Sequence, residues 1–255
     1  MVDASRLRIL NWEGCLNARD LGGYATADGR VTRWGAVVRS DHLTPLTESG
    51  RAAVVAYGVE TIVDLRRPDE LDEHPNPFAG ANRHGISYSN VPFEDPLGGP
   101  PSEPVTLADQ YREMLVSFRP RVGTVMTTLA RASGGGVLIH CRGGQDRTGL
   151  ISALLLDLVA VPREIIGEDY ALTAECLRPM TDEWLANGPG ERADRELFHA
   201  KYTPMAEIII DVLNDVDQRH GGTETYLLQA GMSAGDVPRL RDRLIAPLNA
   251  KAPSI

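Results

Sequence analysis

Cysteine is scarce in this sequence, with only Cys15, Cys141 and Cys176 among 255 residues. A small, odd set does not fit a disulfide framework, and a reducing compartment is the simpler context. Long apolar runs are missing too, since no stretch approaches the ~20 residues that cross a bilayer. The first residues do not combine a basic start with an apolar segment, as a signal peptide would. We therefore expect a cytoplasmic protein without a membrane span, with signal-less export as the alternative.

Basic charge is also in short supply. The chain has 26 Lys and Arg against 35 Asp and Glu, giving a net charge of −9. Proteins whose main partner is nucleic acid usually carry a basic face, so nucleic acid is not the expected partner. The hydrophobic fraction of 42% is ordinary for a soluble globular protein. The length suffices for one large domain with a substantial core.

The first half of the chain alternates strand-like and helix-like segments. Residues 34–39 (WGAVVR) and 61–65 (TIVDL) predict strands, with a helix over 48–57 between them. Thr47 is a suitable N-cap for that helix and Gly58 a suitable end. Two strands joined through a helix form a β-α-β unit, which indicates parallel pairing.

Further elements follow from the same patterns. Residues 86–91 alternate apolar and polar side chains, and residues 137–139 form a short apolar run typical of a central strand. Helical patterns cover 107–118 and 122–132. The segment after Thr148, LISALLLDLVA, is apolar nearly all round and predicts a buried helix.

From Pro162 onward every readable pattern is helical. Ser233 and Asp236 predict a capping box before a helix over 237–248. A glycine-rich break at 187–190 is a candidate hinge. We expect one α/β domain over 1–255, with a central, largely parallel sheet flanked by helices. Its core would span roughly residues 1–173, and roughly residues 174–255 would form a helical extension or lid.

The segment that carries chemistry reads VLIHCRGGQDRTG, residues 137–149. Five residues separate Cys141 from Arg147, in a short loop between a strand and a helix. Such a loop can point successive backbone N–H groups at phosphate oxygens. Gly143 and Gly144 tolerate the positive φ angles this requires, and Arg147 offers a planar fork for two oxygens. The expected phosphate-binding residues are Arg142, Gly143, Gly144, Gln145, Asp146 and Arg147.

The same loop predicts a nucleophile. Helix N-termini and nearby arginines favour the thiolate form of cysteine, so Cys141 is expected to attack phosphorus and form a phosphocysteine. Thr148 can hydrogen-bond the sulfur and stabilise it as a leaving group. Asp146 would repel the phosphate unless it orients Arg142 or another basic group, or moves a proton.

HCRGGQDRTG resembles the HCxxGxDRTG signature of the bacterial atypical tyrosine phosphatases, which are related to dual-specificity and phosphoinositide phosphatases. NARDLGGY at 17–24 is similar to that family's Asn-Phe-Arg-Asp-Leu-Gly-Gly box. Further likenesses lie at 39–40, 64–66 and 226–231. The resemblance covers most of the chain. It implies a phosphatase α/β fold, a phosphorylated substrate and a cysteine mechanism without metal or cofactor.

The chain departs from that family at two positions. Ala18 replaces the usual aromatic residue, a change that reshapes local packing. Gln145 stands where many relatives have lysine. A lysine there would add a point charge that helps to bind polyphosphorylated headgroups. Its absence disfavours a phosphoinositide substrate.

The leaving group needs a proton, ideally from a carboxylic acid beside the scissile oxygen. Asp95 is the first candidate, because it follows a predicted strand and lies in a proline-rich loop over 93–104. It also matches the position of an acidic candidate in the family pattern. Glu94 and Asp146 are rivals, and the alternative is that Asp95 is an ordinary solvated carboxylate.

Three arginines stand at motif positions of the resemblance: Arg19, Arg39 and Arg66. Each either contacts the substrate or ties loops together by hydrogen bonds.

Three functions are compatible with this loop. The leading interpretation is a phosphomonoesterase acting on phosphotyrosine-like substrates, or on a small-molecule phosphate such as a nucleotide, a biosynthetic intermediate or a phosphoinositide. Rhodanese-type sulfur transfer also uses a loop cysteine, but its loop is usually shorter and lacks Arg-Thr. A phosphate-binding pseudophosphatase typically loses the nucleophile or the arginine, and this chain keeps both.

Overall fold

The computed structural model describes residues 8–80, 85–94 and 106–246. Asp95 and most of the predicted loop over 93–104 lie outside these ranges. The described strands form one five-stranded sheet in the order β1-β2-β5-β3-β4. They are β1 (Arg19–Asp20), β2 (Val37–Ser40), β3 (Val59–Asp64), β4 (Ser87–Asn90) and β5 (Gly136–His140). Only β1 pairs antiparallel, so the prediction of a largely parallel sheet is confirmed.

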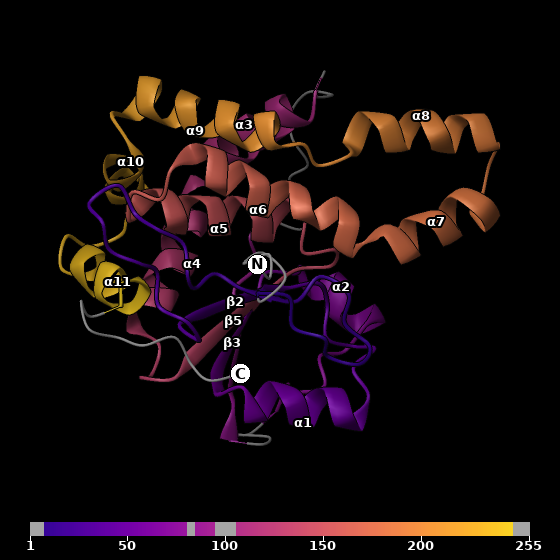
Figure 1. The fold of residues 1–255 in the computed structure, drawn as a ribbon, viewed down its shortest axis with the longest axis horizontal. Helices are drawn as coiled ribbons and strands as arrows, with labels where there is room; N and C mark the ends of the chain where they lie inside the picture. The colour runs from indigo at the N-terminus through magenta and orange to yellow at the C-terminus, as the bar shows by residue number, and fades with distance from the viewer. Residues whose placement is uncertain (1–7, 81–84, 95–105, 247–255) are drawn as a thin grey trace.

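Helices surround this sheet (Figure 1). In chain order they are α1 (Glu48–Ala56), α2 (Pro68–Glu73), α3 (Leu107–Ser117), α4 (Arg119–Arg131), α5 (Asp146–Leu158), α6 (Arg163–Cys176), α7 (Arg178–Asn187), α8 (Arg192–Tyr202), α9 (Ala206–His220), α10 (Thr223–Gln229) and α11 (Asp236–Leu244). The predicted cap is confirmed, because the Thr47 side chain accepts a hydrogen bond from the Gly50 amide at the start of α1. Helix α2 was not predicted. No described helix is long and apolar enough to cross a membrane.

Successive residues of the central strand face two different cores. Val137 and Ile139 of β5 belong to the larger hydrophobic cluster, whereas Leu138 belongs to the smaller one, which includes Val54 of α1. Figure 1 shows α1 on one side of the sheet and α3, α4, α5, α6 and α9 on the other. Because the side chains of a strand alternate between its faces, an apolar run such as 137–139 is what a strand buried on both sides requires.

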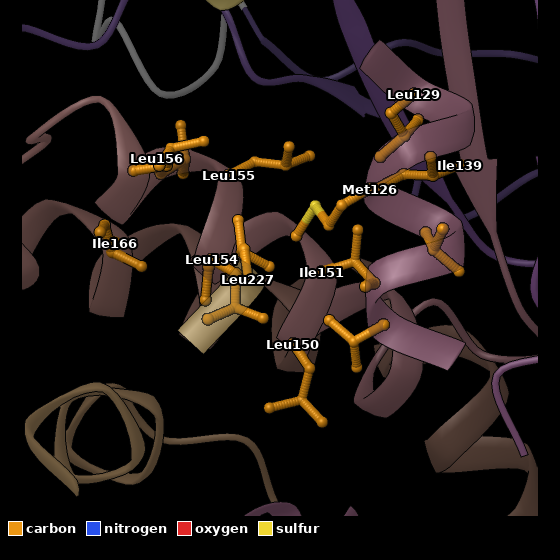
Figure 2. Close-up of a cluster of buried hydrophobic side chains, with 14 of the residues drawn as sticks. Met126, Leu129, Ile139, Leu150, Ile151, Leu154, Leu155, Leu156, Ile166 and Leu227 are labelled. Atoms are coloured by element: carbon orange, nitrogen blue, oxygen red, sulfur yellow. The ribbon is translucent and has the colours of Figure 1, made fainter. Parts of the chain in front are cut away.

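Helix α5 lies inside the larger cluster, as its all-round apolarity predicts. Leu150, Ile151, Leu154 and Leu155 are each at most 1% exposed. Figure 2 shows these side chains gathered with Met126 and Leu129 of α4, Ile166 of α6 and Leu227 of α10. Packing on all sides holds the first turn of α5, and hence the loop before it, in a fixed position relative to the sheet.

The helical C-terminal portion divides into two parts. Helices α7 and α8 form an arm (residues 178–202) that projects from the body, and the predicted break at 187–190 falls between them (Figure 1). Helices α9, α10 and α11 return to the body, where Leu213, Leu227 and Leu240 belong to the larger cluster. Among the described helices after α6, α7 and α8 contribute no buried residue to the larger cluster, and Tyr202 at the end of α8 packs against it.

The predicted capping box is wrong in detail. Helix α11 begins at Asp236, with Gly235 and not Ser233 in the N-cap position. The Ser233 hydroxyl donates to the Asp236 carboxylate at 2.7 Å, and the Asp236 amide donates to the Ser233 carbonyl at 3.0 Å. These bonds close a turn ahead of the helix, so the helix starts three residues after Ser233. It ends at Leu244, short of the predicted residue 248.

Candidate active site

The phosphate loop comprises residues 141–147: residues 141–145 connect β5 to α5, and residues 146–147 are the first of α5. Cys141 therefore lies directly after the central strand. Cys141 is 2% exposed. Gly144 has a φ of +69°, and a Cβ atom there would lie 2.4 Å from the Ser40 carbonyl oxygen. Both facts require glycine at this position. Gly143 differs from the expectation: its φ is not positive, and an added Cβ would meet only Leu177, at 3.9 Å.

His140, the residue before the expected nucleophile, braces the loop. The His140 ring contacts the Cys141 carbonyl through Nδ1 at 3.1 Å, and its Nε2 lies 3.2 Å from an Asp64 carboxylate oxygen. The side-chain nitrogen Nδ2 of Asn76 lies 2.9 Å from Nε2 of His140 as well. Burial raises the pKa of Asp64, but the neighbouring His140 and Arg66 hold it well below its ordinary value. An ionised Asp64 thus fixes the end of β5.

Arg147 is oriented by a carboxylate that the sequence did not reveal. Its Nη1 and Nη2 atoms lie 2.5 and 2.9 Å from the two carboxylate oxygens of Glu70 in α2. Burial raises the pKa of Glu70, but hydrogen bonds from Arg147 and the charge of that arginine lower it overall. Two parallel hydrogen bonds to one carboxylate fix the plane of the Arg147 guanidinium. Glu94 stands farther away, with Oε2 4.0 Å from Nη1 of Arg147.

Asp146 is held by a tyrosine and not by Arg142. The Tyr111 hydroxyl donates to Oδ1 of Asp146 at 2.6 Å, and the Gln145 amide donates to the same oxygen at 3.3 Å. Burial and then the charge of Asp146 raise the pKa of Tyr111 well above its ordinary value, so the phenol keeps its proton. The described residues give Oδ2 of Asp146 no side-chain hydrogen bond. That oxygen can therefore carry a proton to or from a ligand.

Two other loop residues complete the segment. Arg142 is exposed, and its carbonyl accepts a hydrogen bond from the His42 amide at 2.9 Å. The expected bond from Thr148 to the Cys141 sulfur is not formed: within the described residues, the buried Thr148 hydroxyl has no hydrogen-bond partner. Thr148 lies in the first turn of α5, and its orientation there leaves the hydroxyl unpaired.

The three motif arginines are all buried. Arg19 and Arg39 both pair with Asp169 of α6, at 2.9 and 2.7 Å. Arg66 pairs with Asp64 at 2.7 Å and donates to the His74 carbonyl at 2.8 Å. Their side chains are 0 to 1% exposed, so of the two roles left open the contacts favour loop tying over substrate contact.

A pocket of about 440 Å³ opens beside the loop. Gln145 and Asp146 form its loop side, and the arm forms the other side. Gln145 also reaches the arm directly, because its amide donates to the Tyr202 carbonyl at 3.1 Å. The ring centroids of Trp184 and Phe198 lie 5.8 Å apart. The full lining is Gln110, Gln145, Asp146, Met180, Thr181, Trp184, Phe198, His199 and Tyr202.

The remaining cysteines are free thiols. The Cys15 thiol donates to the Asp41 carboxylate at 2.7 Å, and burial followed by the charge of Asp41 raises its pKa strongly. Burial raises the pKa of Cys176 as well. Thiols with raised pKa values react slowly. In the described part of the chain, no cluster of three or more His, Cys, Asp or Glu residues could hold a metal ion.

The sequence as a whole is similar to known tyrosine phosphatases. A tyrosine-protein phosphatase of Nostoc commune is 34% identical over 219 residues, covering 82% of this chain and 74% of the relative. The triple specificity protein phosphatase PtpB of Mycobacterium tuberculosis is 28% identical over 279 residues, covering 91% of this chain and 97% of the relative. The model of the tyrosine phosphatase family matches residues 10–246. The chain therefore belongs to the tyrosine phosphatase family and is a phosphatase-type hydrolase of that family.

Proposed function

We propose that this protein hydrolyses phosphate monoesters through a phosphocysteine on Cys141. The observation that carries the proposal is the strand–loop–helix unit itself. It joins a buried cysteine, a glycine that the backbone requires and an arginine whose fork is held by Glu70. Backbone N–H groups and the start of α5 would surround a phosphate there, with Arg147 closing the ring.

The proposed reaction has two displacements. In the first, the Cys141 thiolate forms a bond to phosphorus while the bond to the ester oxygen breaks, and Asp146 gives that oxygen a proton. In the second, water attacks phosphorus, the sulfur–phosphorus bond breaks, and inorganic phosphate leaves with the thiolate restored. Asp146, now a carboxylate, takes the proton from that water. Arg147 and the loop amides bind the equatorial oxygens in both steps.

The pocket supports a substrate whose phosphate hangs on an aromatic group. Its arm side presents Trp184, Phe198 and Tyr202, and a volume of about 440 Å³ is within the range of small-ligand sites. Aromatic pairs in offset or edge-on contact gain about 0.5–1.5 kcal/mol beyond simple burial. Phosphotyrosine is therefore the favoured substrate class, in keeping with the names of the relatives. In this proposal the arm serves as the lid of the pocket.

Phe198→Ala tests the substrate class. Phe198 is 56% exposed, so its removal should not disturb folding. We expect kcat/KM for a phosphotyrosine peptide to fall about 2- to 10-fold, the worth of an aromatic contact. For glycerol phosphate, which has no ring, kcat/KM should stay unchanged. Leu197→Ala is the matched control, because Leu197 is a 72% exposed residue of α8 outside the pocket lining. Equal losses on both substrates would contradict the aromatic assignment.

Gln145→Lys tests how the loop discriminates polyanions. A lysine adds a positive charge beside the bound phosphate, so kcat/KM for a phosphoinositide should rise about 2- to 5-fold, the worth of one partly exposed ion pair. For a simple aryl phosphate, which carries a single phosphate group, the change should be small. Steady-state assays on both substrates decide between the outcomes. Equal gains would mean that the charge acts on all anions, and Gln145 would then not select against phosphoinositides.

A further inference from the structure

A single buried carboxylate joins two of the motif arginines. Asp169 lies in α6 and is 3% exposed. Arg19 donates to its Oδ1 through Nε at 2.9 Å, and Arg39 donates to its Oδ2 through Nη1 at 2.7 Å. The Tyr24 hydroxyl also donates to Oδ1, at 2.9 Å. Both oxygens are thus occupied by side chains that come from the sheet and the segment next to it.

These arginines lead to two consecutive carbonyls of the phosphate loop. Arg39 uses its second terminal nitrogen to donate to the Gly144 carbonyl at 2.7 Å. Arg19 reaches the loop through Asn17: its Nη1 donates to the Asn17 side-chain oxygen, and Asn17 Nδ2 donates to the Gly143 carbonyl at 2.9 Å. Two hydrogen-bonded paths therefore run from Asp169 to the loop.

Holding these carbonyls determines where the loop amides point. In a trans peptide the C=O and the following N–H lie on opposite sides of the bond. When the carbonyls of Gly143 and Gly144 are bound on the side of Asn17 and Arg39, the N–H groups of Gly144 and Gln145 face the other way. A phosphate loop needs its amides turned inward in this manner.

Charge makes Asp169 essential to both paths. Burial lowers the pKa of Arg39, and the positive charge of Arg19 lowers it further, so the two guanidiniums repel each other. Burial would raise the pKa of Asp169, but the two arginines hold it at about 2. Among the described residues, Asp169 is the only carboxylate that forms an ion pair with Arg19 or Arg39. Without its charge, two buried cations would face each other unopposed.

We infer that Asp169 is a positioning residue for the phosphate loop, acting through Arg39 on Gly144 and through Arg19 and Asn17 on Gly143. It touches neither substrate nor nucleophile. This inference rests on the proposed function, because it assigns the loop amides to phosphate binding. It also links the loop to α6, whose last residue, Cys176, is separated from the arm by one residue, Leu177.

The test is Asp169→Asn, which keeps the size of the side chain and removes its charge. We expect kcat/KM for p-nitrophenyl phosphate, per folded molecule, to fall about 10- to 100-fold, the worth of lost hydrogen bonds to charged groups. The dissociation constant for inorganic phosphate, measured by calorimetry, should rise by a similar factor. Asp236→Asn is the matched control. Asp236, the first residue of α11, is buried and pairs with Arg131 of α4 at 2.8 Å. This variant should lower the melting temperature and leave phosphate affinity unchanged.

A second variant keeps the inference testable if Asp169→Asn does not fold. Asn17→Ala removes one path, to Gly143, and leaves every charge in place, so it should weaken phosphate binding by a smaller factor. Unchanged phosphate affinity in folded Asp169→Asn or in Asn17→Ala would overturn the inference while wild-type turnover still supported the proposed function. Wild-type protein that binds phosphate but hydrolyses no ester would contradict the proposed function alone.

Discussion

Cys141→Ser protein should bind inorganic phosphate with nearly wild-type affinity and lose turnover by a factor on the order of 10⁴–10⁶, as hydrolases do when their nucleophile is removed. The loop amides and Arg147 remain in place, so the anion site persists. A serine hydroxyl is a much weaker nucleophile than a thiolate. Calorimetry with phosphate and a sensitive aryl phosphate assay would measure the two halves of this expectation.

Controls for this substitution come from the chain itself. Cys15→Ser should keep full activity, because the Cys15 thiol is bound to Asp41 and its pKa is raised. Wild-type activity should survive EDTA and be inhibited by vanadate, which mimics five-coordinate phosphorus. Substantial turnover by Cys141→Ser protein would contradict the covalent mechanism, whereas loss of phosphate binding would mean that the substitution damaged the loop.

Asp146→Asn should show a strong dependence on the leaving group. Phenyl phosphate needs a proton as its P–O bond breaks, so kcat/KM, which reports formation of the phosphocysteine, should fall about 10²–10⁴-fold, the usual worth of positioned acid catalysis. p-Nitrophenyl phosphate releases a stable anion, so its kcat/KM should fall far less. Comparing the two substrates over a range of pH values separates proton transfer from phosphate binding. The alkaline limb of the pH–rate profile for phenyl phosphate should also flatten.

Three further variants test whether Asp146 is the acid that protonates the leaving group. Tyr111→Phe removes the hydrogen bond to Oδ1 but keeps the carboxylate, so its leaving-group dependence should stay close to wild type. Asp95→Asn and Glu94→Gln test the carboxylates that the sequence also offers. If Asp95→Asn shows the dependence and Asp146→Asn does not, the proton comes from the segment after β4 and our assignment is wrong.

The phosphate loop was predictable because its parts are local in sequence. An apolar strand, a short glycine-containing loop and an apolar helix follow one another over 137–159, and each has its own residue pattern. The structure places Cys141 and Arg147 accordingly. Two expectations at this loop were wrong: Gly143 does not have a positive φ, and the Thr148 hydroxyl has no hydrogen-bond partner among the described residues.

The residues that support the loop were not predictable, for a different reason. Glu70 lies on a six-residue helix with no apolar periodicity, and only Pro68 and the acidic first turn signal a helix start. Asp169 lies on the buried face of α6, next to Tyr170. A buried carboxylate implies a cation nearby, but nothing in the sequence says that its partners are Arg19 and Arg39, some 150 and 130 residues away.

The sequence did not predict the pocket, because the helices that line it have ordinary residue patterns. Trp184, Phe198 and Tyr202 are spaced over two short helices, and each reads as an ordinary apolar position of an amphipathic helix. These aromatic residues line one pocket with Gln145 and Asp146 because of the direction in which the arm leaves α6 (Figure 1). The sequence does not give that direction. The signal available in the sequence was a pair of aromatic residues one helical turn apart, Phe198 and Tyr202.

The most direct test of the mechanism is to trap the phosphorylated protein during turnover. With p-nitrophenyl phosphate the leaving group departs easily, so breakdown of the intermediate limits the rate and the intermediate accumulates. Rapid quenching into denaturant, followed by peptide mass spectrometry, should find one phosphoryl group on Cys141 at the level of the initial nitrophenol burst. A burst without phosphate on Cys141, or a phosphoryl group on any other residue, would contradict a phosphocysteine intermediate.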